Sequence, residues 1–158
     1  MKIKSLFIYT VSLLMLSSMT FSQDNRTLET KIADLLSQLP ASDIQYKNKL
    51  MGDMLSLGDE GIRKICDQII PPGTGDDTRP RFAVESFSRY LSQKGLENER
   101  LLWEDICISY VTQQNDYLVK DFFIKQLQLI GGDKSVEPLS QYLSDMQVCN
   151  SAIAAITA

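Results

Sequence analysis

Residues 55–65, with the sequence LSLGDEGIRKI, decide the predicted fold, because they join two apolar helical patterns through a tight Gly-Asp turn. Residues 129–139, LIGGDKSVEPL, repeat this arrangement 74 positions later. The shift of 74 pairs Leu55 with Leu129, Gly58 with Gly132, Asp59 with Asp133, Ile62 with Val136, Ile65 with Leu139, and Ile69 with Leu143. We therefore expect two copies of one helix–turn–helix unit.

Helical periodicity continues along the chain from residue 27, and no segment alternates with the sustained period of two that a half-buried strand requires. Each apolar face must be buried against a neighbouring helix, because helices this short are seldom stable alone in water. The predicted core faces are Leu50, Met51, Met54 and Leu55; Ile62, Ile65, Cys66, Ile69 and Ile70; Phe82, Phe87, Tyr90 and Leu91; Leu102, Trp103, Ile106, Cys107 and Tyr110; Val119, Phe122, Phe123, Leu127 and Ile130; and Val136, Leu139 and Leu143. Aspartate at Ile65 or Leu129 is therefore expected to unfold the chain.

Glycine-containing breaks separate the predicted helices at residues 58–61, 94–95 and 131–133, with one longer break at 71–81. Ser42 and Ser135 are the expected N-caps of two helices, the second of which carries Pro138 in its first turn.

The spacing of the two related units predicts a repeat architecture. A separation of 74 residues is two periods of about 37, and the helix pair expected at 81–113 fills the gap. Stacked helical hairpins of this length predict an all-α fold, an α-α superhelix or solenoid, with about three to three and a half hairpins over residues 23–158. A closed bundle of four to six helices is the alternative.

The repeated motif resembles that of HEAT-repeat proteins of the armadillo-type superhelix class, in particular their exported bacterial members. The residues that carry the resemblance are Gly58, Asp59, Ile62 and Ile65, and then Lys120, Asp121, Phe122, Leu129, Gly132, Asp133, Val136, Pro138, Leu139 and Leu143. The middle unit, residues 81–113, departs from the motif because it lacks the Gly-Asp turn. The resemblance covers residues 27–158 and implies a binding scaffold that has no chemistry of its own.

Residues 1–22 are predicted to be a cleaved secretory signal peptide. Lys2 and Lys4 precede an apolar run at residues 6–16, and small residues allow cleavage after Ser22. A retained membrane anchor is the alternative, but it needs about 20 apolar residues, more than this run offers. The mature chain is therefore expected in the periplasm or outside the cell, without stable membrane insertion.

Composition excludes several classes of function. The chain contains no His, so it cannot hold a Ser-His-Asp triad, a Cys-His dyad or an HExxH zinc site. Cleavage would remove two Lys and no acidic residue, which takes the net charge from −4 to −6. A negative chain repels nucleic acid. We accordingly expect no enzyme activity, cofactor, metal or nucleic-acid partner.

Some side chains suggest chemistry but fit a structural role better. Cys66, Cys107 and Cys149 lie beside apolar helical positions and are expected to be buried thiols, with one disulfide as the alternative. The carboxylate pairs at residues 97/99 and 104/105 are expected on the solvated side of their helix. Phe87, Trp103 and Tyr110 could anchor a partner, but their spacing with aliphatic residues predicts core positions.

Four arginines form the candidate partner-binding set, namely Arg79, Arg81, Arg89 and Arg100. If they share one surface, their guanidinium groups would suit an acidic peptide or a carboxylate. Scattered surface charge is the alternative. The long break at 71–81 is the expected place of variable partner contacts, because long loops often carry function.

We therefore expect a non-catalytic scaffold of the bacterial envelope that binds a protein or peptide. Alternatively, it is a docking or substrate-presenting appendage of an envelope enzyme whose catalytic domain lies beyond residue 158. Residues 151–158 are apolar and lack the polar outer face with which solenoids close, so further repeats or dimerisation are expected at that end.

Overall fold

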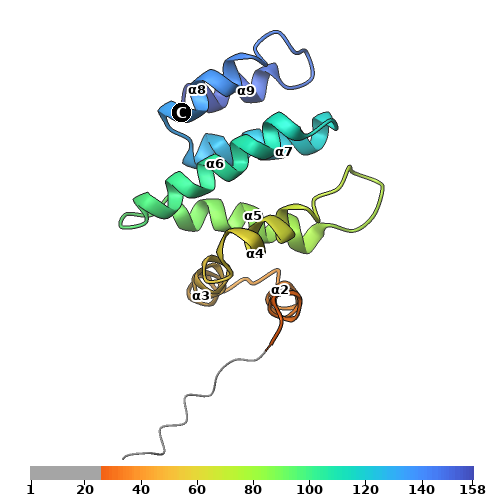
Figure 1. Ribbon diagram of the computed structural model, residues 1–158, viewed down its shortest axis with the longest axis vertical. Helices are drawn as coiled ribbons and strands as arrows, with labels where there is room; N and C mark the ends of the chain where they lie inside the picture. Colours follow the sequence, from red (N-terminus) through yellow and green to blue (C-terminus); the bar gives the residue numbers. More distant parts are fainter. Residues whose placement is uncertain (1–25) are drawn as a thin grey trace, which may run out of the picture.

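The computed structural model describes residues 26–158, so the expected signal peptide lies outside the described residues (Figure 1). This part of the chain contains eight α-helices and no strand, and the all-α prediction is confirmed. The helices are α2 (Leu28–Ser37), α3 (Ile44–Leu55), α4 (Gly58–Cys66), α5 (Thr78–Leu91), α6 (Glu97–Gln113), α7 (Tyr117–Ile130), α8 (Asp133–Ser140) and α9 (Cys149–Ile156). None of them has both the length and the apolar run that crossing a membrane requires.

Consecutive helices form pairs that follow one another along the longest axis of the molecule, from α2 and α3 at one end to α8 and α9 at the other (Figure 1). The odd-numbered helices α3, α5, α7 and α9 pack in a row, each against the next. On the other side, α2 packs against α4 and α6 against α8. The substantial contacts between the helices of residues 26–158 all lie within one pair or between consecutive pairs.

Polar side chains cap the N-termini of three helices. The side chains of Thr27, Asp43 and Asp116 accept hydrogen bonds from backbone N–H groups in the first turns of α2, α3 and α7. The prediction of Ser42 as the cap of α3 is therefore wrong by one residue.

The start of α8 also differs from its prediction. Gly132, not Ser135, is its N-cap residue, and Pro138 lies beyond the first turn. The Ser135 hydroxyl instead donates a hydrogen bond to Glu104. The glycine breaks at 94–95 and 131–132 lie at helix junctions as predicted, whereas residues 58–61 form the first turn of α4 and the junction lies just before them, at residues 56–57. Two positions need glycine, since Gly58 has a φ of 69° and Gly95 a φ of 90°.

The core runs the length of the molecule between the two rows, and most predicted core residues are buried in it. Phe87 and Trp103, at its centre, meet edge to face with ring centroids 5.3 Å apart. Four predicted core residues are exposed instead: Leu102, Leu129, Val136 and Leu143. The first lies on the outer side of α6, and the others lie at or near α8, which no later helix of its row covers within residues 26–158.

Candidate binding surfaces

One concave surface runs along α2, and we call it the α2 groove. Two adjoining hollows of about 440 Å³ and 220 Å³ form it, and they share Ala33, Leu36 and Gln68. Its lining residues are Glu29, Ile32, Ala33, Leu36, Ser37, Lys64, Gln68, Asp76, Arg79 and Pro80. The groove thus has an apolar floor of α2 residues, and polar side chains reach it from both ends of α2, from α4 and the residues after it, and from the start of α5 and the residues before it.

Charged side chains of both signs line the α2 groove. Lys64 donates a hydrogen bond to Glu29 at 2.9 Å, which raises the pKa of Lys64 and lowers that of Glu29. The backbone N–H of Thr78 donates to Asp76 at 3.0 Å, and bonds from Thr78, with the nearby Arg79 charge, lower the pKa of Asp76. Arg79 is exposed, so its guanidinium is available to a ligand carboxylate.

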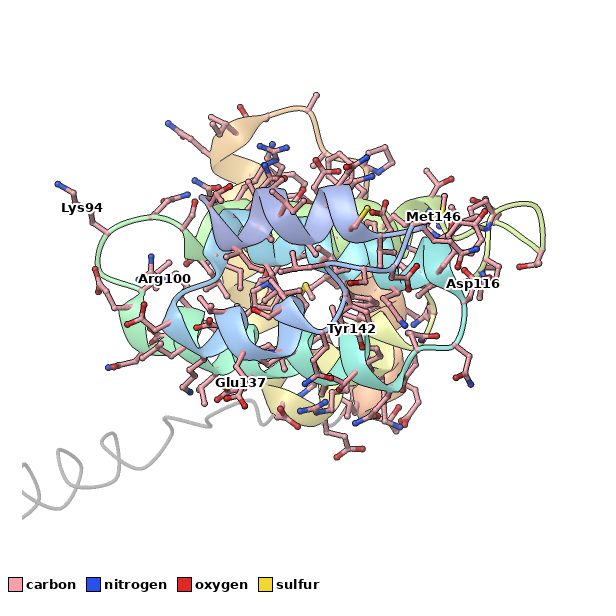
Figure 2. All side chains as sticks on the ribbon, turned by 90° about the horizontal axis from the view of Figure 1, so that it is seen from above. Lys94, Arg100, Asp116, Glu137, Tyr142 and Met146 are labelled. Atoms are coloured by element: carbon pink, nitrogen blue, oxygen red, sulfur yellow. The ribbon has the colours of Figure 1, made fainter. Side chains whose placement is uncertain are left out.

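The four arginines of the candidate set have different surroundings. Arg79 lines the α2 groove. Arg89 forms an exposed ion pair with Glu85 one turn earlier in α5. Arg100 lies on the side of the molecule that carries the α5–α6 turn with Lys94 (Figure 2). No contact among residues 26–158 joins these side chains to one another.

Arg81 holds the long loop before α5. Its Nε lies 2.7 Å from Asp77, its terminal nitrogen donates to the Ile70 carbonyl at 2.6 Å, and its guanidinium lies 4.8 Å above the Phe122 ring. The Ile70 N–H donates to Asp77 at 3.0 Å. Burial raises the pKa of Asp77, but these hydrogen bonds outweigh burial and lower it overall. Arg81 therefore has a structural role, and only Arg79 of the four lines the groove.

A second concave surface lies between α4 and α6, and we call it the α4–α6 hollow. It has a volume of about 90 Å³ and is lined by Leu55, Gly58, Asp59, Ile62, Phe87, Glu99, Leu102, Trp103 and Ile106. Most of these side chains are apolar, and Leu102 leaves 66% of its surface exposed. Periodicity alone misses this surface, because it places Leu102 in the core.

Two cysteine thiols are buried as predicted. Burial raises the pKa of Cys66 and of Cys107 well above the ordinary thiol value. Cys149 is only partly buried, and the three cysteines form no disulfide with one another in the described chain. A raised pKa keeps a thiol protonated and therefore poorly nucleophilic.

One predicted surface carboxylate is buried. Glu104 is 1% exposed, whereas its neighbour Asp105 is exposed and pairs with Lys134 at 2.9 Å. Glu104 accepts hydrogen bonds from the Gly132 N–H at 2.7 Å and from the Ser135 hydroxyl at 2.6 Å. These donors belong to the start of α8, whose cap residue has no side chain, so Glu104 satisfies that helix end from α6.

Comparison with known proteins gives no family. No family model, no curated protein and no solved structure matches the chain. Within residues 26–158, no group of three or more Cys, Asp or Glu side chains is placed to hold a metal ion.

Proposed function

We propose that the chain is a non-catalytic scaffold of the bacterial envelope, built from HEAT-like repeats, that binds a protein or peptide. The pattern of helix packing is the observation that carries this proposal. The substantial contacts join helices of one pair or of consecutive pairs, as they do in solenoids. A closed bundle would also bring the first and last pairs together.

Hydrogen bonds that link one pair to the next also support the repeat architecture. Arg63 of α4 donates to Ser109 of α6 at 3.0 Å, and Tyr110 of α6 donates to Asp67, just after α4, at 2.6 Å. Glu104 makes the corresponding link from α6 to α8. Each unit thus depends on its neighbours, which is the energetic pattern of repeat proteins.

The α2 groove is the surface that we propose for partner binding. An apolar floor with a few polar groups on its walls is typical of sites that bind peptides, because the floor gives affinity and the walls fix orientation. Arg79 offers two parallel N–H donors to a partner carboxylate, and Gln68 offers an amide. A segment with an apolar side chain followed by Asp or Glu would suit both features.

Affinity capture from envelope extract tests this function. The full-length gene product is compared with Arg79→Glu, which reverses the charge on the wall, and with Ala33→Arg, which fills the floor. Lys94→Glu is the control, because it makes the same charge change on the turn at the far end of α5. We expect the wild type and the control to capture the same protein. Neither groove variant should capture it.

The experiment requires that all four proteins have the same helicity by circular dichroism. Retention of the same protein by the groove variants would contradict the α2 groove as the binding surface. Failure of wild type to retain any protein above the level of an unrelated exported protein would contradict the scaffold function itself.

A further inference from the structure

We propose that the α4–α6 hollow is a second binding site, which takes a segment of a partner protein carrying an aliphatic side chain next to Lys or Arg. This inference rests on the proposed function as a binding scaffold but concerns a surface other than the α2 groove. Three observations carry it: the apolar hollow, the exposure of Leu102 at its rim, and the carboxylates beside it.

The shape and lining of the hollow fit one aliphatic side chain. Its volume is about 90 Å³, and Ile62, Phe87, Trp103 and Ile106 form its buried apolar wall. An apolar cavity of about 150 Å³ is large enough to hold benzene, so this hollow suits a group of roughly the size of a leucine side chain. A ligand side chain there would also cover Leu102, which removes apolar surface of both molecules from water.

The charges at the hollow favour a cation beside that side chain. Glu99 lines the hollow and makes no ion pair with the described part of the chain. Asp59 lines it too; it pairs with Arg63 at 2.8 Å but stays largely exposed. Arg63 is shared, because it also donates to Ser109. The lining of the hollow therefore holds two carboxylates and no Lys or Arg, and these carboxylates would attract Lys or Arg and repel an acidic segment.

Trp103 provides a direct readout of binding. It is the only tryptophan of the chain, and it lines the hollow, so its fluorescence reports a side chain that enters there. The probe is acetyl-Gly-Lys-Leu-Lys-Gly-amide, titrated into the full chain at low salt. One buried aliphatic side chain and one exposed ion pair predict a saturable change with a Kd on the order of 1 mM.

Two altered peptides test the chemistry of the ligand. Replacing the central Leu by Ala removes the group that fills the hollow, and replacing both Lys by Glu reverses the charges. We expect neither peptide to change Trp103 emission over the same range. The response to the Lys-Leu-Lys peptide is also expected to weaken as salt is added, because Asp59 is exposed and Glu99 is only partly buried, so salt screens both charges.

Two protein variants test the residues of the hollow. Leu102→Ser removes exposed apolar surface and is expected to raise the Kd at least about fivefold. Glu99→Gln removes the unpaired charge and is expected to raise it between about 1.5-fold and fivefold. Leu143→Ser and Glu137→Gln, which make the same changes at exposed positions near α8, are the controls and should bind like wild type.

Three results would overturn the inference. They are an unchanged Trp103 spectrum with the Lys-Leu-Lys peptide, an equal response to the Glu-Leu-Glu peptide, and unchanged affinity in both Leu102→Ser and Glu99→Gln. If one of these results is found but the wild type still captures a protein that both groove variants lose, the scaffold function is not contradicted. Retention of the same protein by wild type and by both groove variants, together with a normal peptide titration, would overturn the α2 groove and leave this site in place.

Discussion

The Ser135 hydroxyl of α8 donates a hydrogen bond to the carboxyl group of Glu104 of α6 at 2.6 Å, and both side chains are buried. The same carboxyl group accepts from the Gly132 N–H, so one side chain of α6 satisfies two donors at the start of α8. Because these donors have no other partner in the described chain, their burial depends on Glu104, although other contacts also join the third and fourth helix pairs.

Glu104→Ala is therefore expected to lower the free energy of unfolding by about 2–4 kcal/mol, since it leaves two buried donors unsatisfied. Asp105→Ala is the matched control on the next residue of α6. Its ion pair with Lys134 is exposed on both sides, so its removal should cost less than about 1 kcal/mol. Urea unfolding followed by circular dichroism measures both. Equal losses of unfolding free energy in the two variants would show that the buried hydrogen bonds of Glu104 contribute no more stability than the exposed ion pair of Asp105.

The repeated motif contains buried and exposed apolar positions, and substitutions at Ile65 and Leu129 distinguish the two kinds. Ile65 is fully buried, so Ile65→Asp places an unpaired charge in the core and is expected to abolish the folded state. Leu129 is 37% exposed, so Leu129→Asp should cost no more than about 1–2 kcal/mol and keep native helicity. Thermal melts followed by circular dichroism measure the stability of both variants. A Leu129→Asp protein that is unfolded at room temperature would contradict the observed exposure.

The hydrogen bond from the Trp103 indole to the Ser88 hydroxyl, 2.9 Å long, joins α6 to α5 in the core. Ser88→Ala leaves the indole N–H buried without an acceptor and is expected to cost about 1–3 kcal/mol. It should also alter Trp103 emission, because the indole loses its polar neighbour. Ser92→Ala is the control, since its exposed hydroxyl bonds only to the Arg89 carbonyl. An unchanged emission spectrum in Ser88→Ala would contradict the hydrogen bond.

The sequence predicts the helices well because their formation is local. Apolar spacing and glycine breaks indicate which residues can form one face and where that face must end. The α7–α8 turn lies where it is expected, and the α3–α4 turn lies two residues earlier than expected. It predicts α6 less well. Apolar residues surround much of this helix, so periodicity does not distinguish buried Trp103 from exposed Leu102.

Long-range partners lie beyond sequence reasoning of this kind. Glu104 and Asp105 are adjacent carboxylates, and only the position of α8, about 30 residues later in the chain, decides which of them is buried. The α2 groove likewise needs side chains from α2, α4 and the start of α5. Arg81 could have been recognised, because Asp77 lies four residues earlier on the same helical face.

The buried thiols predict how stability depends on pH. Burial raises the pKa of Cys66 and Cys107 in the folded chain, whereas the unfolded chain ionises these thiols near pH 8.5. The folded state therefore binds more protons above that pH, and the free energy of unfolding should fall by up to about 1.4 kcal/mol per pH unit for each thiol. Below the unfolded pKa this contribution is fully present. Urea titrations between pH 7 and 10 measure the slope.

The Cys66→Ala/Cys107→Ala variant serves as the comparison, because it should show a shallower loss over the same range. Tyr110 adds to the dependence only near pH 10, where unfolded tyrosine ionises, since burial and its hydrogen bond to Asp67 raise its pKa in the folded chain. Equal slopes in wild type and variant would contradict the role of the thiols. Thiol labelling at pH 8 should modify Cys149 alone in the folded chain and all three cysteines in urea.

Gln126 of α7 offers a route to a more stable protein. Its amide nitrogen donates to the Phe122 carbonyl at 2.9 Å, but its buried Oε1 accepts no hydrogen bond from the described chain. Gln126→Met keeps the length of the side chain and removes the unsatisfied acceptor, so we expect the free energy of unfolding to rise by about 1 kcal/mol. Gln128→Met changes an exposed glutamine of the same helix and should leave stability within about 0.5 kcal/mol of wild type. If urea unfolding shows that Gln126→Met is less stable than wild type, the amide oxygen must have a partner in solution, and burial of this side chain is not a cost to the fold.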